Sequence, residues 1–561
     1  MDIIIRTTHE ATVALRGDTA IALDIETNGL SPYDNDIMVI SMHGLESGAT
    51  AVLHFPSGAM WPSQLLKDPT KTWVTHNGTI FDLQFFRYRG YRFVKHYDTL
   101  IGEAVLNTQD RRDVKKSLGA TMVRRTGQNL KKSIDHSVWS KPFLQEDELE
   151  YAVHDVLHLH DIRNEQERLA SERGLAEALR REQELSLISM EVMFNGMALP
   201  HKVYSGIRQE YLDKAAEAKA RLDDAFGDKF NVNSSKQVKE GLSKMGIEVE
   251  TTNVVQLNEL IHAYEIIGDI VTARKSRKKS GMYDENWYDN FTSKERLHVK
   301  YWQMGTDTTR YSSSGPNLQQ IPREMRHMIG NEPGKKVVWV DYAQLEGRIV
   351  ADITKDTELV KALDEQDFHT SMASVIFRTP YDQVDKLTRD RGKKFSFTFL
   401  FGGGAHSMVA SARTDGQELT RHEAFKILHG LRDRFIKVAA WHNKEAQRIN
   451  AGAPVLKVQL PWGHQRQILR AHQSPARLVN TKVQGTAAVG FKEALFEIDK
   501  RGLTKYIGGL IHDEIMATSV PDNEANDYGH ELAEAMQVGM QQVMQFMKTP
   551  VDIAIGDKWG N

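Results

Sequence analysis

Two short apolar segments near opposite ends of the chain carry acidic residues where a buried strand normally excludes them. Residues 22–28 read ALDIETN and residues 508–518 read GGLIHDEIMAT. On a strand, residues i and i+2 face the same side, so Asp24 and Glu26 project together. Buried carboxylates are costly unless they are paired or bind a metal. Both segments therefore raise the question of what their carboxylates bind.

The length and composition set limits on the architecture. A chain of 561 residues exceeds what one hydrophobic core supports, so we expect two to four domains. The absence of cysteine excludes a disulfide framework and thiolate zinc sites. No segment approaches the ~20 apolar residues of a membrane span, and the N-terminus lacks a signal-peptide pattern, so we expect a cytoplasmic protein without membrane contact. With a net charge of −3, any nucleic-acid surface must be local.

The order of predicted elements divides the chain near residue 185. Residues 18–60 alternate short β-type runs with turns, and residues 145–192 are helical without proline. Residues 202–280 are polar and helical, which predicts a projecting subdomain. Further on we expect a strand that turns into a helix at 336–352, helices at 383–401 and 421–449, strands at 505–518, and a closing helix from about 522.

Four carboxylates in the N-terminal third are candidates for one metal site. Asp82 lies in the aromatic segment THNGTIFDLQFF, and Tyr151 and Asp155 are four residues apart on one helix face. Together with Asp24 and Glu26, the two aspartates could hold two divalent cations, for which all-oxygen ligation favours Mg²⁺ or Mn²⁺. Taken singly, a D-x-E pair is more often a surface feature of a turn, and Asp155 a solvated helix residue.

A second site is indicated around Asp341 and a later helix. The run VVWV ends in Asp341, which taken alone is better explained as a helix N-cap than as a catalytic residue. Arg389, Lys393, Phe397 and Phe401 recur every four residues, which places them on one helical stripe about 18 Å long. Two cations followed by two aromatics suit a nucleoside triphosphate, although an amphipathic helix with core phenylalanines is the plainer alternative.

Several polar residues have the chemistry of DNA contacts. The segment TRYSSSGPNLQQIP contains Arg310, Asn317 and Gln319, side-chain types that bind groove edges and the sugar–phosphate backbone. Asn480 and Gln484 stand at i and i+4 on an otherwise apolar helix and need partners. The basic run RKSRKK, with Arg274 and Lys275, suits backbone contact, but a surface loop and a solvated charged helix explain these segments nearly as well.

The order of these motifs resembles two known families. D-x-E, H-N-x3-F-D and Y-x3-D, over residues 15–185, resemble the DnaQ-like (DEDDy) 3′→5′ exonuclease domain. TRYSSSGPNLQQIP, DYAQLEGR, R-x3-K-x3-F-x3-FG, QGTAA and HDE, over residues 186–561, resemble the polymerase domain of family A DNA polymerases. The resemblance implies a multidomain α/β and α+β fold, with a ribonuclease H-like exonuclease domain (1–185) before a right-hand polymerase domain (thumb about 186–300, palm and fingers about 301–561).

The resemblance also implies roles for individual residues. Asp24, Glu26, Asp82 and Asp155 would hold the exonuclease metals, with Tyr151 positioning the attacking water. Asp341 and Asp513, with the carbonyl of Tyr342, would hold the polymerase metals, and Glu514 would be a supporting acid that tolerates change. The expected nucleotide contacts are Arg389, Lys393, Phe397, Phe401, His369, Gln344 and the steric gate Glu346. The expected DNA contacts are Arg310, Asn317, Gln319, Asn480, Gln484, His512, Arg274 and Lys275.

We therefore expect a DNA-directed DNA polymerase with a 3′→5′ proofreading exonuclease, two Mg²⁺ per active site with Mn²⁺ able to substitute, and template–primer DNA and dNTPs as partners. A phage replicase with an unidentified processivity factor fits the compact length. The alternatives are an exonuclease whose C-terminal region only grips DNA, and a non-catalytic DNA-binding module. One departure from the family is Phe401, where tyrosine is common; without that hydroxyl, we expect Glu346 to be less firmly held. The family arginine eight residues before Gln484 is replaced by Ala476, and neighbouring Arg477 has no assigned role.

Overall fold

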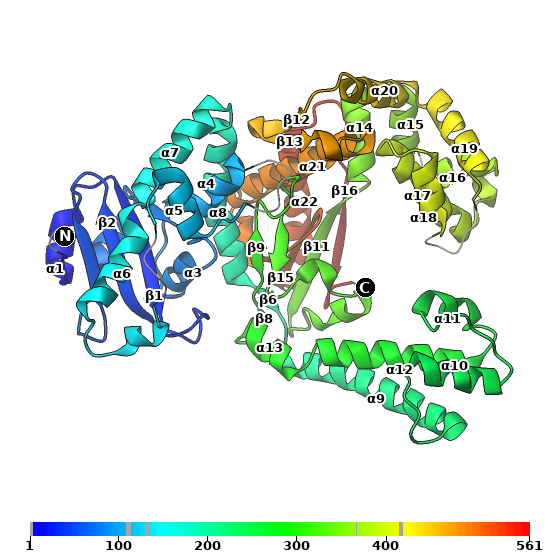
Figure 1. Ribbon diagram of the computed structural model, residues 1–561, viewed down its shortest axis with the longest axis horizontal. Coiled ribbons are helices and arrows are strands. Elements are labelled where there is room, and N and C mark those ends of the chain that lie inside the picture. The colour runs from blue at the N-terminus through cyan, green and yellow to red at the C-terminus, as the bar shows by residue number, and fades with distance from the viewer. Residues whose placement is uncertain (1–3, 108–113, 130–133, 366, 414–418, 561) are drawn as a thin grey trace.

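The structure, a computed structural model, describes residues 4–107, 114–129, 134–365, 367–413 and 419–560. Figure 1 shows an N-terminal α/β unit beside a central part built on a sheet, and two helical projections that extend from the central part toward the same side. None of the helices in the described part of the chain is long and apolar enough to cross a membrane.

The N-terminal unit is a five-stranded mixed sheet covered by helices. Its strand order is β3-β2-β1-β4-β5, with β1 antiparallel to β2 and parallel to β4. Its elements are α1 (Thr8–Leu15), β1 (Ala20–Thr27), β2 (Ile37–Gly44), β3 (Thr50–His54), α2 (Ser63–Leu66), β4 (Thr72–Thr75), α3 (Asp82–Tyr88), β5 (Lys95–Asp98), α4 (Thr99–Leu106), α5 (Leu118–Thr126), the 3-10 helix η1 (His136–Ser140), α6 (Glu146–Leu157) and α7 (Leu159–Glu172).

Strand β1 is central and buried on both faces. Ile21, Leu23 and Ile25 pack into one hydrophobic cluster, whereas Ala20 and Ala22 pack into another on the opposite face. Because side chains alternate along a strand, Asp24 and Glu26 continue the alanine face toward the carboxyl end of β1. The apolar alternation thus fixes where the two carboxylates point.

Helix α8 (Ala176–Asn195) joins the N-terminal unit to the central part without a break. Ala178 and Leu179 belong to an N-terminal hydrophobic cluster, and Leu185 and Val192 belong to the central one. Residue 185 therefore lies inside a continuous helix, and no break in the backbone marks it. The domain boundary near residue 185 stays a prediction.

The junction along α8 contains a fully buried charged group. The Glu182 carboxylate accepts hydrogen bonds from Lys492 Nζ and, at 3.0 Å, from His464 Nε2, and all three side chains are inaccessible to solvent. Gln303 Nε2 donates to the same carboxylate at 2.7 Å. Each buried charge is compensated, which locks α8 onto the central part.

The first projection is a pair of long helices with a small helical tip. Helices α9 and α12 pack along each other, and the tip has its own hydrophobic cluster, as the polar helical sequence at 202–280 predicts. The elements here are α9 (His201–Phe226), α10 (Ser235–Lys244), α11 (Val254–Leu260), α12 (Glu265–Met282) and α13 (Glu285–Phe291).

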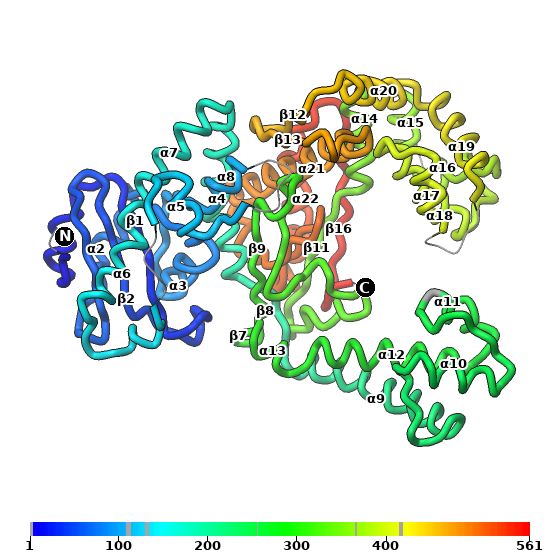
Figure 2. Tube along the Cα trace, viewed as in Figure 1, coloured from blue at the N-terminus to red at the C-terminus, as the bar shows by residue number. Residues whose placement is uncertain are grey.

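The central part is an antiparallel sheet of order β14-β15-β11-β16, with α22 packed on β11 and β16. Figure 2 shows the last strand lying beside β11, about two hundred residues earlier in the chain. The elements are β11 (Lys335–Tyr342), α21 (Pro475–Lys500), β14 (Ile507–Ile511), β15 (Glu514–Pro521), α22 (Ala525–Gln541) and β16 (Val551–Gly556). The prediction that the chain closes with a helix is wrong, because β16 follows α22 and completes the sheet.

The second projection carries the helix with the basic and aromatic stripe. It contains α14 (Leu345–Thr354), α15 (Thr357–Glu365), α16 (Phe368–Phe377), η4 (Tyr381–Gln383), α17 (Lys386–Leu400), α18 (Ala405–Arg413), α19 (Arg421–Arg434) and α20 (Ile436–Asn450). Short elements complete the central part: β6 (Met197–Ala198), β7 (Thr292–Ser293), β8 (Arg296–Leu297), β9 (Lys300–Trp302), β10 (Ser312–Ser314), η2 (Leu318–Gln320), η3 (Arg323–Met328), β12 (Val455–Gln459), η5 (Pro461–Gly463), β13 (Gln465–Leu469), η6 (Arg470–His472) and η7 (Leu503–Tyr506).

Candidate active sites

Three of the four N-terminal carboxylates converge. Asp24, Glu26 and Asp155 each offer an oxygen, and these oxygens all lie within 4.8 Å of one another. Asp24 and Glu26 come from β1, and Asp155 comes from α6, which packs against β1 and β2. The strand spacing and one helix contact are thus sufficient to assemble the group.

Asp82 is adjacent to this group and is held by the backbone. Its Oδ1 accepts a hydrogen bond from the Ile25 amide at 3.0 Å, which ties α3 to β1 between the two other acids. The turn before it is organised by the buried Asp98, which accepts hydrogen bonds from the amides of Asn77 and Thr79 at 2.8 and 3.2 Å. Asp98 was not a candidate from sequence, because a single aspartate at the end of a strand belongs to no motif that would single it out.

The electrostatics of this site favour a bound cation. Burial raises the pKa of Glu26 to about 8 and the pKa values of Asp82 and Asp155 to about 7, and neighbouring carboxylates add to the rise at Glu26 and Asp82. Burial and the same neighbours raise the pKa of Asp24. Among the described residues, no lysine or arginine forms an ion pair with these four acids. An all-oxygen donor set with uncompensated charge fits a divalent cation.

The open side of this group is a cavity of about 630 Å³, lined by Glu26, Phe81, His136 and the 27–30 loop. His136 Nδ1 lies 3.3 Å from Glu26 Oε2. Tyr151 lies one helical turn before Asp155, and burial, followed by the charges of Asp155 and Glu26, raises its pKa. The hydroxyl therefore stays protonated at neutral pH and can hold a water molecule. His136 was missed because η1 brings it to Glu26 from 110 residues away.

The second group of carboxylates surrounds the end of β11. Strand pairing places both Glu514 of β15 and Asp552 of β16 directly opposite Asp341. His512 and Asp513 form the turn between β14 and β15, with His512 in the left-handed region at φ 58°. Asp513 therefore lies in the turn, and Glu514, the first residue of β15, occupies the position paired with Asp341.

Asp341 has the environment of a metal ligand. Burial raises its pKa to about 7, and the charge of Asp513 adds more than those of Glu514 and Asp552. Its Oδ1 is buried and has no hydrogen-bond partner in the described part of the chain. The Tyr342 side chain is committed elsewhere, since its hydroxyl donates to the Met536 carbonyl at 2.6 Å. An orphaned carboxylate oxygen beside further acids fits a divalent cation.

Glu514 is restrained from the C-terminal segment. Trp559 Nε1 donates to Glu514 Oε1 at 2.8 Å, and the Arg326 guanidinium lies 4.3 Å from the Trp559 ring centroid. Trp559 is fully buried. Neither residue was a candidate from sequence, because the contact joins positions 45 residues apart through strand β16.

The stripe on α17 has the predicted arrangement. Phe395 and Phe399 are buried, whereas Phe397 and Phe401 are half-buried and stack at 6.1 Å. His369 of α16 lies 5.6 Å from the Phe397 ring, and burial together with Lys393 and Arg389 lowers its pKa to about 4. Lys393 is exposed. Arg389 Nε donates to Asp367 Oδ1 at 2.9 Å, and Arg389 Nη2 donates to Asp367 Oδ2 at 2.7 Å.

The candidate gate Glu346 has a partner that the sequence did not suggest. Arg310 Nη2 donates to Glu346 Oε1 at 2.9 Å, and both side chains are about a quarter exposed. Gln344, at the start of α14, adopts φ 55°, and its Oε1 is buried without a partner in the described residues. The expectation that Glu346 is loosely held because Phe401 lacks a hydroxyl is thus weakened by an ion pair.

The remaining candidate DNA contacts fall into two kinds. Asn480 and Gln484 line a cavity of about 430 Å³ together with Arg466 and Lys116, and Asn480 Oδ1 is buried without a described partner. In contrast, Arg274 points inward, where its guanidinium donates to the Val232 and Thr252 carbonyls at 2.6 Å. The prediction that Arg274 contacts the DNA backbone therefore has no support in its geometry.

Four other candidates are accessible or locally bonded. Lys275 and His512 are exposed. Asn317 caps η2 by accepting from the Gln319 amide at 3.1 Å, and Gln319 Nε2 donates to the Tyr311 carbonyl at 3.2 Å. Both side-chain amides thus form hydrogen bonds with the backbone of their own loop.

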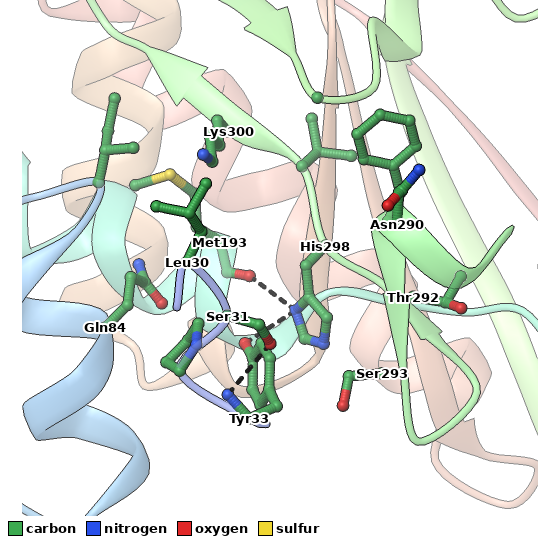
Figure 3. A pocket seen from close by; sticks show the side chains of 15 residues that line it. Leu30, Ser31, Tyr33, Gln84, Met193, Asn290, Thr292, Ser293, His298 and Lys300 are labelled. Carbon is green, nitrogen blue, oxygen red and sulfur yellow. Dashed lines mark hydrogen bonds between the residues drawn. The ribbon is translucent and has the colours of Figure 1, made fainter. Parts of the chain in front are cut away.

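The two units also meet at a cavity of about 370 Å³ between the 30–33 loop and β7–β9 (Figure 3). Tyr33 stacks on His298 with ring centroids 4.1 Å apart, and its hydroxyl lies 2.9 Å from His298 Nδ1. His298 Nδ1 also lies 3.2 Å from the Met193 carbonyl of α8. The loop that follows Glu26 is therefore fastened to the central part.

Comparison with solved structures shows the class of fold. The POL domain of Pol1 from M. smegmatis, solved in complex with DNA primer-template and dNTP, matches with a TM-score of 0.80 over 99% of both chains at 19% identity. The chain thus shares the fold of this structure along nearly its whole length.

Sequence comparison identifies the family. The model described as DNA polymerase family A matches residues 201–561, well over half of the chain, and the model described as 3′-5′ exonuclease matches residues 5–169. The chain belongs to DNA polymerase family A.

Curated relatives agree with this assignment. DNA polymerase I of Chloroflexus aurantiacus is 26% identical over 97% of this chain and 62% of the relative. Thermostable DNA polymerase I of Thermus aquaticus is 28% identical over 67% and 47%. DNA polymerase I of Aquifex aeolicus is 24% identical over 88% and 89%. The chain thus spans between about half and three fifths of the first two relatives.

Proposed function

We propose that the protein is a template-directed DNA polymerase that adds dNTPs to a primer 3′ end and removes mispaired ends with a 3′→5′ exonuclease. The observation that carries this proposal is the presence of two separate carboxylate groups, one in each matched region. Each group combines buried acids of raised pKa with few basic partners, as expected for sites that act on phosphodiesters with divalent cations.

At the polymerase site, Asp341 and Asp513 would hold two Mg²⁺ ions, for which Mn²⁺ can substitute, with the Tyr342 carbonyl as a further ligand. Bound divalent cations supply charge neutralisation to the reacting phosphate. Arg389, Lys393 and His369 bind the triphosphate, and Phe397 packs on its sugar. Glu346, held by Arg310, limits the space at the 2′ position.

At the exonuclease site, Asp24, Glu26, Asp82 and Asp155 would hold the cations and orient the terminal phosphodiester. The protonated Tyr151 hydroxyl holds the attacking water by a hydrogen bond. The template–primer duplex lies against Asn480, Gln484 and His512, and Lys275 contacts the sugar–phosphate backbone of the DNA. The cytoplasmic location, the phage origin and a processivity factor stay predictions.

A primer-extension assay tests this proposal. With Mg²⁺ and dNTPs, the wild-type protein extends a primer; with Mg²⁺ alone, it shortens the primer from the 3′ end. Asp24→Ala should remove shortening and leave extension, and Asp513→Ala should do the reverse. An enzyme that shortens primers but never extends them would instead be a nuclease with a DNA-gripping C-terminal region. A protein that binds the primer and does neither would be a binding module.

A further inference from the structure

The two cations of the α17 stripe differ in their partners. Arg389 is engaged by Asp367 in a two-nitrogen, two-oxygen pair at 2.9 and 2.7 Å. Lys393, one turn further along, forms no ion pair with any residue that the structure describes. Both Arg389 and Asp367 are about a third exposed, at 35% and 37%, so a solute can reach them.

The Asp367 carboxylate presents to Arg389 what a phosphate would present. Two oxygens facing the planar guanidinium are the arrangement through which arginine binds both carboxylates and phosphates. A phosphate group that takes up Arg389 in the same way must therefore displace Asp367. Although burial opposes it, hydrogen bonding to Arg389 and to Thr370 holds the pKa of Asp367 well below its usual range. The Asp367 carboxylate is therefore ionised at neutral pH, where it competes with other anions for Arg389.

Asp367 can release Arg389 without losing all of its partners. It is the N-cap of α16, where its Oδ1 accepts a hydrogen bond from the Thr370 amide at 2.7 Å. The same helix carries His369 two residues later, beside Phe397. When Arg389 turns to another anion, Asp367 remains bonded to the helix terminus, so the exchange leaves no unpartnered carboxylate.

We propose that Asp367 is a specificity-determining residue that competes with the phosphates of the incoming nucleotide for Arg389. This inference rests on the proposed function of the α17 stripe. A complete triphosphate reaches Lys393 and His369 as well as Arg389, and so it displaces Asp367. A diphosphate or pyrophosphate makes fewer of these contacts, so the pair between Arg389 and Asp367 weakens its binding more.

The test compares two aspartates with the same local role. Asp367→Asn keeps the cap and the shape but removes the charge that Arg389 binds through two hydrogen bonds; the longer ion pair between Arg389 Nη1 and Asp390, at 3.8 Å, remains. Asp385→Asn is the matched control, because the Asp385 side chain caps α17 by accepting from the Thr388 amide at 2.7 Å and makes no described contact with the Arg389 guanidinium. The Asp385 backbone carbonyl, which accepts from the Arg389 amide at 2.9 Å, is unchanged by the substitution. Asp367→Ser, which also caps a helix, is the second variant if the asparagine protein is unstable.

Two readouts are measured for each protein: the KM and kcat for single-nucleotide incorporation, and the binding of pyrophosphate and tripolyphosphate by calorimetry in the absence of DNA. We expect Asp367→Asn to lower the KM about 2- to 10-fold and to strengthen pyrophosphate binding more than tripolyphosphate binding, with kcat unchanged, since exposed pairs are of modest strength. Asp385→Asn should change neither.

An unchanged KM and unchanged pyrophosphate affinity in Asp367→Asn would overturn the proposal. A higher KM would also overturn it, because Asp367 would then be holding Arg389 in its productive position. Failure of the proposed function itself looks different: the wild-type protein would not extend a primer, whereas calorimetry would still report whether removing Asp367 frees Arg389 for anions.

Discussion

In the N-terminal site, Asp24, Glu26 and Asp155 already point at one another, and their like charges are compensated only by protons or a cation. In the second site, the groups expected to meet substrate are engaged with other parts of the chain: Glu346 with Arg310, and Arg389 with Asp367. The first site is built on one strand and one helix of one sheet. The second gathers residues from a sheet and a separate projection, so its assembly requires internal pairs to be exchanged for substrate.

The sharpest test of this comparison contrasts two acids that pair across neighbouring strands, Asp341 of β11 and Asp552 of β16. Asp341→Asn should reduce primer extension by at least about 100-fold, because it removes a charge that neutralises a cation at the reacting phosphate. Asp552→Asn is its matched control, since Asp552 lies directly opposite Asp341 but is exposed. We expect less than about a fivefold loss there. Primer shortening should be unchanged in both; equal losses in the two variants would contradict the placement of the metal at Asp341.

The uncompensated charge of the N-terminal site should be visible as a pH dependence of stability. In the metal-free protein, the pKa of Glu26 is raised from 4.5 to about 8. Between these values the folded state binds a proton that the unfolded chain has released, so stability falls as pH rises from about 4.5 to about 8. Mg²⁺ binds the deprotonated group, so the rise in unfolding temperature on replacing EDTA by Mg²⁺ should grow across this window.

Glu26→Gln isolates that effect. Without the charge, the metal-free protein should be more stable at pH 8 by on the order of 1–3 kcal/mol, and its gain from Mg²⁺ should shrink. Glu46→Gln, on an exposed turn of the same unit, provides the control and should leave the fall in stability between about pH 4.5 and 8 intact, because hydrogen bonds from Thr19 hold the pKa of Glu46 below this window. A gain from Mg²⁺ that does not change with pH would argue against a coupled carboxylate site.

A moderate effect is expected at the restraint on Glu514. Trp559→Phe keeps most of the buried ring but removes the hydrogen bond to Glu514 Oε1. One hydrogen bond to a charged group is worth about 1.5–3 kcal/mol. Because Glu514 supports the metal ligands and is not itself expected to be one, we expect about 0.7–2 kcal/mol of this to be lost from the barrier, so that extension falls about 3- to 30-fold with shortening unaffected. Trp441→Phe, at a half-buried ring in α20, is the control. A Trp559→Phe enzyme with full extension activity would show that Glu514 needs no restraint.

The smallest effect is expected at Phe401→Tyr. The new hydroxyl can add a second partner for Glu346, but Arg310 already holds that carboxylate at 2.9 Å. We therefore expect preference for dNTP over rNTP to rise by no more than about threefold. Steady-state incorporation of both nucleotides measures this, and a rise of tenfold or more would mean that the Arg310 pair does not persist when DNA is bound.

What the sequence revealed about these sites follows the range of the interactions involved. Asp24 and Glu26 follow from alternation along one strand, and the α17 stripe follows from helical periodicity, both of which are local. Asp98, Asp367 and Trp559 escaped notice because each acts through a hydrogen bond whose partner is fixed only by tertiary packing. The pairing of Asp341 with Glu514 has the same origin: the residues HDE do not show how many of them belong to the turn.

The continuity of α8 bears on how the protein can be taken apart. A polymerase fragment that began at residue 186 would discard Glu182 and leave Lys492, fully buried, with no counter-charge, a change that costs about 3–5 kcal/mol in such pairs. A fragment that keeps α8 from Ala176 retains the carboxylate and its contacts with Lys492 and His464. A C-terminal fragment should therefore begin at Ala176, although its expected active-site residues begin much later. The first turn of α8 in such a fragment carries Ala178 and Leu179, which in the intact protein pack into the core of the N-terminal unit.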